Sequence, residues 1–360
     1  MNSASSALCP HFGVCGGCLW QDLEAPAYLA RKRDLITDAL HHHGIDGEVA
    51  EVYPVAPCSR RRARLKAERR DGGIVIGFHA RSSHALVDMT TCKVLTPGLL
   101  ACVSGVRQRL GALLRNGDTL ELYLGESESG IDLAFSGRLG GKTRATLAII
   151  AEFARWAEPL GLSRVTLNGH LALLLSPPRI ALGKASVELP PGGFLQPTRA
   201  GEARLQSLVA KALGKAKSVA DLFAGCGTFT FIAAERAAVH AVESDPRALQ
   251  ALATAARHAS GLKPVSTELR DLARLPLGPM ELKRFDAIIL DPPRAGALAQ
   301  SEALAASAVS RIVYVSCNPS SFARDARRLM AKGFAMDVIQ PVDQFLWSDH
   351  IELVTVFTRR

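Results

Sequence analysis

The sequence has no apolar run of membrane-spanning length, no internal repeat and no low-complexity linker. Its first residues, MNSASSALCPHFG, also lack the basic start and apolar stretch of a signal peptide. We therefore expect a cytoplasmic protein without a membrane partner. Thiols are kept reduced in that compartment, so the eight cysteines are predicted to be free, metal-bound or catalytic rather than paired in disulfides.

Acidic residues are fewer than basic ones, and the basic excess is concentrated in one stretch. The net charge is +9, and residues 60–81 hold eight basic and two acidic residues, a local charge of +6. Such a patch suits a polyanionic partner, with nucleic acid the leading candidate, although a solvated basic strand pair explains it equally well. If RNA binds, the side chains expected to face the active-site cleft and contact phosphates are Arg60, Arg61, Arg62 and Arg64.

The length and an ordinary globular composition, 48% hydrophobic and 21% charged, predict two or three domains. Residues 1–20 form a cysteine-rich segment. Residues 21–187 begin with a helix that ends near Gly44 and continue with alternating or β-branched segments, interrupted by helices near 97–115 and 144–160. This pattern predicts a central α+β domain with an antiparallel sheet. Because it carries the basic patch, it is the expected RNA-binding domain.

Residues 188–360 alternate apolar strands with helices, which predicts an α/β domain with a doubly wound, mostly parallel sheet and an antiparallel final strand. Parallel strands end at one edge of such a sheet, where ligands bind. Successive predicted strands there end near Gly225, Glu243, Asp271 and Asp291. The glycine lets the backbone approach a ligand, Glu243 suits ribose hydroxyls, and Asp271 could accept from an adenine amino group.

Neither a GxGxxG nor a Walker pattern occurs in the first of these turns, so a cofactor with a pyrophosphate fits poorly. A nucleoside cofactor without a diphosphate fits better, and S-adenosylmethionine is the common one. The alternative is that these carboxylates are only surface residues after strands.

The fifth strand of this domain brings Cys317 to the same sheet edge. A cysteine there is often a small buried hydrophobic residue. A thiolate at this point could instead add to C6 of a uracil, which makes C5 nucleophilic enough to accept a methyl group. The adduct then needs a base to remove the C5 proton, and Glu352, just before the last strand, is the candidate carboxylate.

Several segments in one order over nearly the whole chain resemble the RNA 5-methyluridine methyltransferases. They are CPHFGVCGGC at 9–18, Cys92, GFLQP at 193–197, DLFAGCGTFT at 221–230, ILDPPRAG at 289–296, SCNPSSFARD at 316–325 and FLWSDHIE at 345–352. They are most similar to the bacterial iron–sulfur branch that modifies 23S ribosomal RNA. The resemblance implies a class I methyltransferase-like fold in the C-terminal domain.

By position, the resemblance implies that Cys317 is the nucleophile and Glu352 the base. It implies a cofactor site made of Gln196, Gly225, Glu243 and Asp291, with Phe194 and Asp271 as helpers. Two positions depart from the family's motifs, because Thr228 replaces an asparagine and Ser348 replaces a threonine. Both replacements affect hydrogen bonds around the site rather than the reaction.

Three cysteines, Cys9, Cys15 and Cys18, follow a C-x5-C-x2-C pattern, and Cys92 lies further along the chain. Four thiolates can hold a [4Fe–4S] cluster or a tetrahedral zinc, and the spacing alone does not separate them. The resemblance implies a [4Fe–4S] cluster held by all four, which would pin the N-terminal segment to the central domain. We expect the remaining Cys58, Cys102 and Cys226 to have packing roles.

We therefore expect an S-adenosylmethionine-dependent RNA uracil-C5 methyltransferase that acts as a monomer, with 23S ribosomal RNA as the first candidate substrate. Alternatives are a transfer RNA uridine substrate, or an RNA cytidine-C5 methyltransferase, which uses the same C6 adduct. The cytidine-C5 enzymes usually carry a second cysteine where this chain has DPPRAG at 291–296. A catalytically inactive iron–sulfur RNA-binding protein is a further alternative.

Overall fold

The computed structural model describes residues 9–359, so residues 1–8 of the predicted cysteine-rich segment and Arg360 lie outside it. The helices are α1 (Ala25–His42), α2 (Pro97–Leu110), α3 (Leu147–Ala157), α4 (Arg199–Leu213), α5 (Thr230–Ala234), α6 (Pro246–His258), α7 (Pro279–Leu282), α8 (Leu298–Ala305) and α9 (Pro319–Met330). None of these helices combines the length and apolar character needed to cross a membrane.

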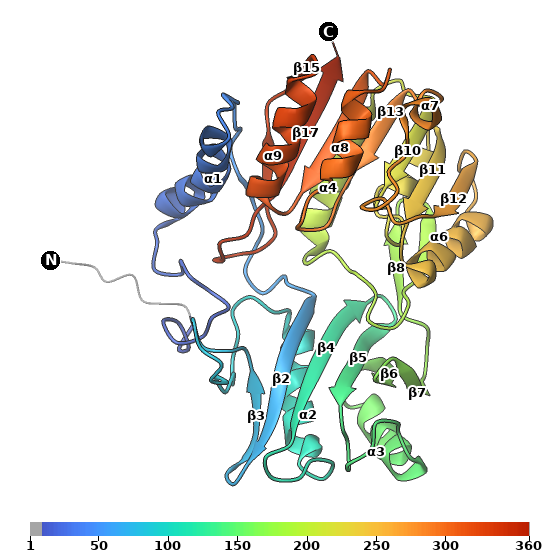
Figure 1. The fold of residues 1–360 in the computed structure, drawn as a ribbon. Coiled ribbons are helices and arrows are strands. Elements are labelled where there is room, and N and C mark those ends of the chain that lie inside the picture. Colours follow the sequence, from blue (N-terminus) through green and yellow to red (C-terminus); the bar gives the residue numbers. More distant parts are fainter. Residues whose placement is uncertain (1–8, 360) are drawn as a thin grey trace, which may run out of the picture.

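The upper layer in Figure 1 is built on a nine-stranded sheet. Its strands are β1 (Tyr53–Pro54), β10 (Ser218–Leu222), β11 (Ala238–Glu243), β12 (Val265–Leu269), β13 (Ala287–Leu290), β14 (Arg311–Ser316), β15 (Phe334–Met336), β16 (Gln340–Asp343) and β17 (Glu352–Arg359). The order β14-β13-β10-β11-β12 is parallel throughout, and β17 pairs antiparallel with β14. The predicted parallel α/β sheet with an antiparallel final strand is confirmed.

Helices on this sheet begin where strands end, because capping residues follow the strands directly. Asp245 follows β11 and its side chain accepts from the backbone N–H of Arg247, which caps α6. Asn318 follows β14 and accepts from the N–H of Ser320, which caps α9. In both helices a proline occupies the first position, where its missing N–H and fixed φ cost nothing. The strand ends are therefore held at one rigid edge.

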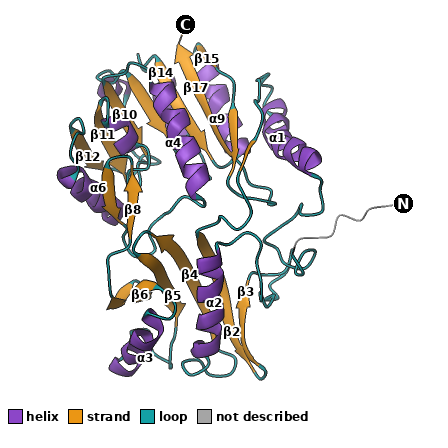
Figure 2. Cartoon of the chain, turned by 180° about the vertical axis from the view of Figure 1, so that it is seen from behind, coloured by secondary structure: helices purple, strands orange, loops and turns teal. Residues whose placement is uncertain are grey.

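The lower layer is a six-stranded sheet of order β3-β2-β4-β5-β6-β7, packed against α2 and α3. Figure 2 shows these two helices on the face turned toward the viewer. Its strands are β2 (Arg62–Arg70), β3 (Gly73–Gly77), β4 (Thr119–Ser127), β5 (Gly130–Gly137), β6 (Leu162–Leu167) and β7 (His170–Leu174). All neighbouring pairs are antiparallel except β5 with β6. A hairpin of β8 (Arg179–Leu182) and β9 (Ala185–Glu188) packs on the upper layer beside α6.

The start of the described chain also joins the upper layer. Helix α1 packs beside α9 through Ile36 and Leu40, which are buried in one core with Phe322 and Leu329. Strand β1 then pairs parallel with β16 at the edge of the nine-stranded sheet. Residues from both ends of the described chain thus meet on one side of the upper layer. The predicted boundaries at 20/21 and 187/188 stay predictions.

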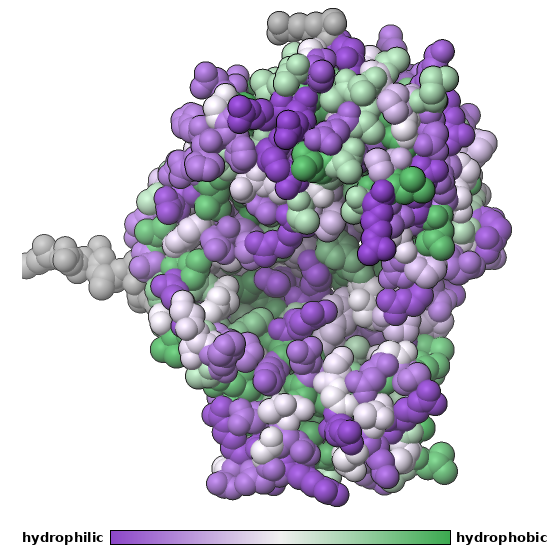
Figure 3. Space-filling view, viewed as in Figure 1, coloured by the Kyte–Doolittle hydropathy of each residue, from purple (hydrophilic) through white to green (hydrophobic). Residues whose placement is uncertain are grey.

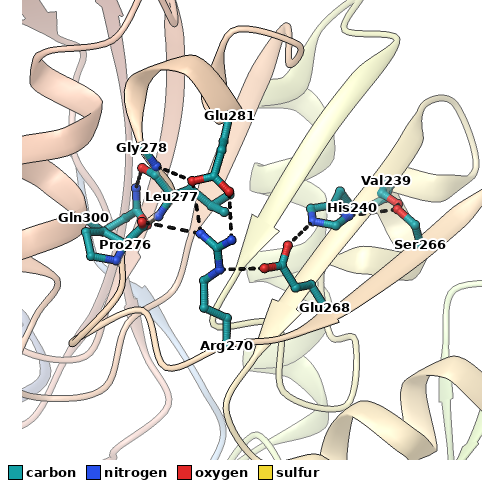
Figure 4. Close-up of polar contacts among 10 residues, drawn as sticks. All are labelled: Val239, His240, Ser266, Glu268, Arg270, Pro276, Leu277, Gly278, Glu281 and Gln300. Atoms are coloured by element: carbon teal, nitrogen blue, oxygen red, sulfur yellow. Dashed lines mark hydrogen bonds and ion pairs between the residues drawn. The ribbon is translucent and has the colours of Figure 1, made fainter.

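The opposite edge of the nine-stranded sheet is tied to α7 by a polar network (Figure 4). Arg270, just after β12, donates to both carboxylate oxygens of Glu281 in α7, at 3.1 and 2.7 Å. Glu268 of β12 lies at 2.5 Å from Arg270 Nε and at 2.9 Å from a ring nitrogen of His240 in β11. An edge strand needs such partners because one of its sides has no neighbouring strand. The network therefore fixes the strand that flanks the predicted cofactor edge.

Candidate active site

A cleft of about 560 Å³ lies between the two layers, at the carboxyl ends of the parallel strands. On the face shown in Figure 3 the surface is hollowed where the upper and lower layers meet. The cleft is lined by seven of the eight predicted catalytic and cofactor residues, namely Phe194, Gln196, Gly225, Glu243, Asp291, Cys317 and Glu352. Its volume is in the range of small-molecule sites. The structure thus brings together residues that are up to 158 positions apart in the chain.

The turn after β10 has the open backbone that a nucleoside requires. Gly225 has φ of 55°, and an added Cβ there would meet no atom within 4 Å. At Gly227, with φ of 98°, a Cβ would come within 2.5 Å of the Phe231 ring, so only glycine fits. Phe223 also has a positive φ, 64°, which is strained for an aromatic residue. Strained backbone at a ligand-facing turn is typical of functional sites.

Glu243, at the end of β11, is held by backbone N–H groups on both carboxylate oxygens. Its Oε2 accepts from Gly225 at 2.9 Å, and its Oε1 accepts from Ser244 and Asp245 at 2.6 and 2.7 Å. This carboxylate is therefore oriented toward the glycine turn before any ligand binds. A fixed acceptor at this point matches the two hydroxyls of a ribose.

Glu352, the first residue of β17, is 5% exposed and joined to the predicted cofactor residue Gln196 through a third side chain. The amide nitrogen of Gln344 donates to Gln196 Oε1 at 2.8 Å and to Glu352 Oε1 at 3.2 Å. Burial raises the pKa of Glu352 to about 7, while Gln344 and the charge of Arg62 oppose the rise. A carboxyl group with this pKa can accept a proton near neutral pH.

Cys317 lies directly after β14 and faces the same cleft. Its thiol pKa is raised to about 12, first by burial and then by the carboxylates of Glu352 and Asp291, with Arg294 acting in the opposite direction. The pKa of Asp291 is itself raised well above its usual value, mainly by burial and also by Glu352. The thiol and two carboxyl groups thus share one poorly solvated space, in which the cations of Arg294 and Arg62 favour the thiolate.

Phe194 and Arg62 form the wall of the cleft that the lower layer and the linker contribute. The Arg62 guanidinium lies over the Phe194 ring, 4.5 Å from its centroid. Burial lowers the pKa of Arg62 to about 10, and within residues 9–359 its Nε has no hydrogen-bond partner. Phe194 is 55% exposed, so its ring, beside the Arg62 cation, is available to a planar, polar ligand such as a base.

Asp271 is the predicted site residue that does not line this cleft. It is exposed after β12, accepts from the backbone N–H of Ala273 and pairs with Arg274 at 3.5 Å. Its proposed contact with adenine stays a prediction. In the other direction, the sequence pattern missed Gln344 and Arg294 as neighbours of the reacting groups, whereas Arg62, which was predicted to face the cleft, does line it. The only sequence signal for Gln344 as a site residue was its position, as a polar residue directly after a short strand.

The basic tract at 60–64 does not form one surface, so its predicted common face is wrong. Arg61 is 2% exposed, pairs with Glu202 at 2.8 Å and donates through Nε to the backbone oxygen of Gln196. Arg60 lines a pocket with the cysteines, whereas Arg62 lines the catalytic cleft. Of the four arginines, Arg64 is the one classed as exposed. Arg61 therefore supports the cofactor side of the cleft instead of contacting phosphates.

The four predicted cluster cysteines, Cys9, Cys15, Cys18 and Cys92, line one pocket near the start of the described chain. Burial raises the pKa of Cys18 to about 12, with smaller contributions from the other three sulfurs. Backbone N–H groups are directed at two of the sulfurs, from Gly17 to Cys15 at 3.4 Å and from Val94 and Leu95 to Cys92. All eight cysteines are free thiols.

Within the described residues, however, no three His, Cys, Asp or Glu side chains are grouped tightly enough to stand as a metal centre. The four thiols share a pocket without converging on one point. The donor set suits a thiolate-bound iron–sulfur cluster or zinc.

Comparisons with known proteins agree with the chemistry of the cleft. The family model for tRNA (Uracil-5-)-methyltransferase matches residues 184–360. An uncharacterized RNA methyltransferase of Brucella suis is 43% identical over 357 residues, which cover 98% of this chain and 84% of that protein. The 23S rRNA (uracil(1939)-C(5))-methyltransferase RlmD of Chromohalobacter salexigens is 33% identical, over 98% of this chain and 76% of its own.

The fold has a counterpart of the same extent. The crystal structure of Pyrococcus abyssi tRNA (uracil-54, C5)-methyltransferase in complex with S-adenosyl-L-homocysteine superimposes with a TM-score of 0.74, at 21% identity, over 95% of this chain and 86% of that one. This likeness confirms the predicted methyltransferase-like architecture. With relatives that match nearly its whole length and the family model over its catalytic half, the chain belongs to the RNA uracil-5-methyltransferase family.

Proposed function

We propose that this enzyme transfers a methyl group from S-adenosylmethionine to C5 of a uridine in 23S ribosomal RNA. The observation that carries the proposal is the single cleft in which a thiol, a buried carboxyl group and an open nucleoside turn face one another. The glycine turn and the backbone-fixed Glu243 suit the cofactor's ribose, and Gln196 lies between them and the reacting groups. When bound, the cofactor supplies an electrophilic methyl group.

In the proposed reaction, the Cys317 thiolate adds to C6 of the uracil, and the electron pair released at C5 accepts the methyl group. Glu352 then removes the C5 proton, the C6–S bond breaks, and the thiolate is regenerated. Arg294 and Arg62 favour ionisation of the thiol, against the effects of burial and of the neighbouring carboxyl groups. Arg62 and Phe194 line the cleft, where a cation and an exposed ring can bind the target base.

Ribosomal RNA is preferred over transfer RNA because the 23S rRNA enzyme of Chromohalobacter salexigens is 33% identical to this chain, whereas the tRNA enzyme of known structure is 21% identical. We expect mass-spectrometric mapping of total RNA to show one 23S 5-methyluridine that is present with the gene and lost without it. Loss of a transfer RNA 5-methyluridine instead would make transfer RNA the substrate. Loss of a 5-methylcytidine would contradict the proposal.

A second prediction separates the nucleophile from the base. Glu352→Gln removes the proton acceptor but leaves the thiol, so attack and methylation proceed and elimination slows by about 100-fold or more. A methylated RNA–enzyme adduct should then accumulate and survive denaturing electrophoresis. Cys317→Ala should abolish both turnover and adduct, because Cys226, the other thiol that lines the cleft, is buried in the glycine turn and packs in an apolar cluster with Phe231.

RNA with 5-fluorouridine at the target serves as the control, because fluorine cannot leave as a proton. It should trap the wild-type enzyme and Glu352→Gln to the same extent. An adduct formed by Cys317→Ala on this RNA would disprove the covalent mechanism. Loss of activity in Glu352→Gln without a trapped adduct would reduce Glu352 to a structural role.

A third prediction follows from the raised pKa of Glu352. Only the ionised carboxylate can accept the C5 proton, so kcat should rise with pH through about 7 and level off above it. Adduct formation on fluorouridine RNA does not use this step and should lack that ionisation. Equal pH profiles for turnover and for fluorouridine trapping would contradict the assignment of this pKa to the elimination step.

We also propose that Cys9, Cys15, Cys18 and Cys92 hold a [4Fe–4S] cluster. The support is the shared pocket, the backbone N–H groups directed at two sulfurs, and Arg60, whose charge offsets thiolates there. Anaerobically purified protein should contain about four irons per chain and absorb as a brown protein. Cys92→Ser should lose the iron, whereas Cys102→Ser, a buried cysteine outside the pocket, should retain it. One zinc and no iron would overturn the choice of metal.

A further inference from the structure

The proposed base lies at the end of a loop that has no regular secondary structure of its own. Residues 344–351 connect β16 to β17, with Gln344 at the start and Glu352 directly after the end. These two side chains are hydrogen-bonded to each other, and Glu352 lines the cleft. The direction of the Glu352 carboxylate therefore depends on what fixes this loop, which we call the catalytic loop.

A lysine from the other end of the chain closes the catalytic loop. Lys32, in α1, is 0% exposed, and its ammonium donates to Asp343 Oδ1 at 2.7 Å, to Phe345 O at 2.9 Å and to His350 O at 2.6 Å. An ammonium has three N–H groups, so all of them are used. Two of the acceptors lie near opposite ends of the loop, and Lys32 holds them at one point.

Tyr28, one turn earlier in α1, adds a second attachment. Its hydroxyl donates to Asp343 Oδ2 and accepts from the backbone N–H of Trp347 at 2.8 Å. Trp347 has a φ of 59°, which is unfavourable for a side chain of this size. Such a backbone conformation persists only where surrounding contacts impose it. The contacts from α1 are placed to do so.

The cysteine-rich segment reaches the same residue from another side. The backbone N–H groups of Leu19 and Trp20 donate to the carbonyl oxygen of Trp347, at 2.6 and 3.2 Å. The Trp347 and Leu346 side chains pack in one small apolar cluster with Tyr28 and Cys18. The middle of the catalytic loop is thus bound by two N-terminal segments.

We propose that Lys32, together with Tyr28 and Asp343, is a positioning residue that holds Gln344 and Glu352 in their catalytic orientation. A buried ion pair is by itself weak support for a stabilising role, because desolvation offsets most of the attraction. Here the pair also satisfies two loop carbonyls, which an apolar replacement could not do. The proposal rests on the proposed function, since it takes Glu352 as the base.

The test compares Lys32→Met with Arg33→Met, which removes the same charge from an exposed position of the same helix. We expect Lys32→Met to lower kcat by about 10- to 100-fold, because small misplacements of a reacting group cost rates of this size. The KM for S-adenosylmethionine should stay within about twofold, since the glycine turn and Glu243 are not touched. Arg33→Met should behave as wild type.

A merely structural role would not change which step is slow. In Lys32→Met a methylated adduct should accumulate on natural RNA, as in Glu352→Gln, while the rate of trapping on fluorouridine RNA stays the same. Hydrogen exchange should show lost protection of the amides in 344–352. If Lys32→Met does not fold, Tyr28→Phe, which removes one hydroxyl, should give the same pattern with a smaller fall in kcat.

The possible failures are distinguishable. A folded Lys32→Met or Tyr28→Phe protein with unchanged kcat would overturn the positioning proposal, as would an equal fall in turnover and in fluorouridine trapping. A Glu352→Gln protein that traps no adduct would contradict the base itself, whatever the Lys32 variant does.

Discussion

The burial of the Glu352 carboxyl group is the constraint on which the arrangement of this molecule depends. Taking a carboxyl group out of water raises its pKa to about 7, which makes it a usable proton acceptor near neutral pH but penalises its ionised form. In the unfolded chain the pKa of this carboxyl group is about 4.5. Folding therefore becomes less favourable as the pH rises from about 4.5 through about 7, where the buried group must ionise. The surrounding contacts must therefore offset the cost of keeping the ionised Glu352 carboxylate buried.

Two neighbouring side chains meet this requirement. Gln344 gives the carboxyl group its hydrogen-bond donor, and Arg62 gives it a cation from the lower layer. Arg61, one residue earlier, turns the other way and holds the backbone of Gln196 and the carboxylate of Glu202. Two adjacent arginines thus connect the lower layer to both sides of the cleft, so this part of the basic tract makes contacts inside the molecule.

The sequence predicted what local pattern and chain order determine. The strand–helix alternation, the parallel sheet and the convergence of Gly225, Glu243 and Cys317 at one edge all follow from periodicity and from the position of each residue after its strand. The side-chain destinations in the tract at 60–64 could not be predicted, because consecutive residues at the start of β2 point toward different layers. A count of charges does not contain that information.

Lys32 illustrates the same limit more sharply. In the sequence it lies in ARKRDL, between other basic residues, where a lysine on a solvated helix face is the ordinary expectation. Its burial depends on α1 packing beside α9 and on β16 ending in Asp343, which is 311 residues away. Long-range partners of this kind are visible only after the fold has placed them together.

The replacement of the family's threonine by Ser348 can be judged in the same physical terms. Its hydroxyl donates to the backbone oxygen of Phe345 at 2.8 Å and accepts from the N–H of His350 at 3.3 Å, so a serine supplies both bonds. These are the two residues whose carbonyl oxygens also accept from Lys32. The catalytic loop is therefore closed twice, by its own serine and by a lysine from α1. The backbone of Leu19 and Trp20 reaches the same loop at Trp347, so this part of the cysteine-rich segment supports the loop that ends at the proposed base.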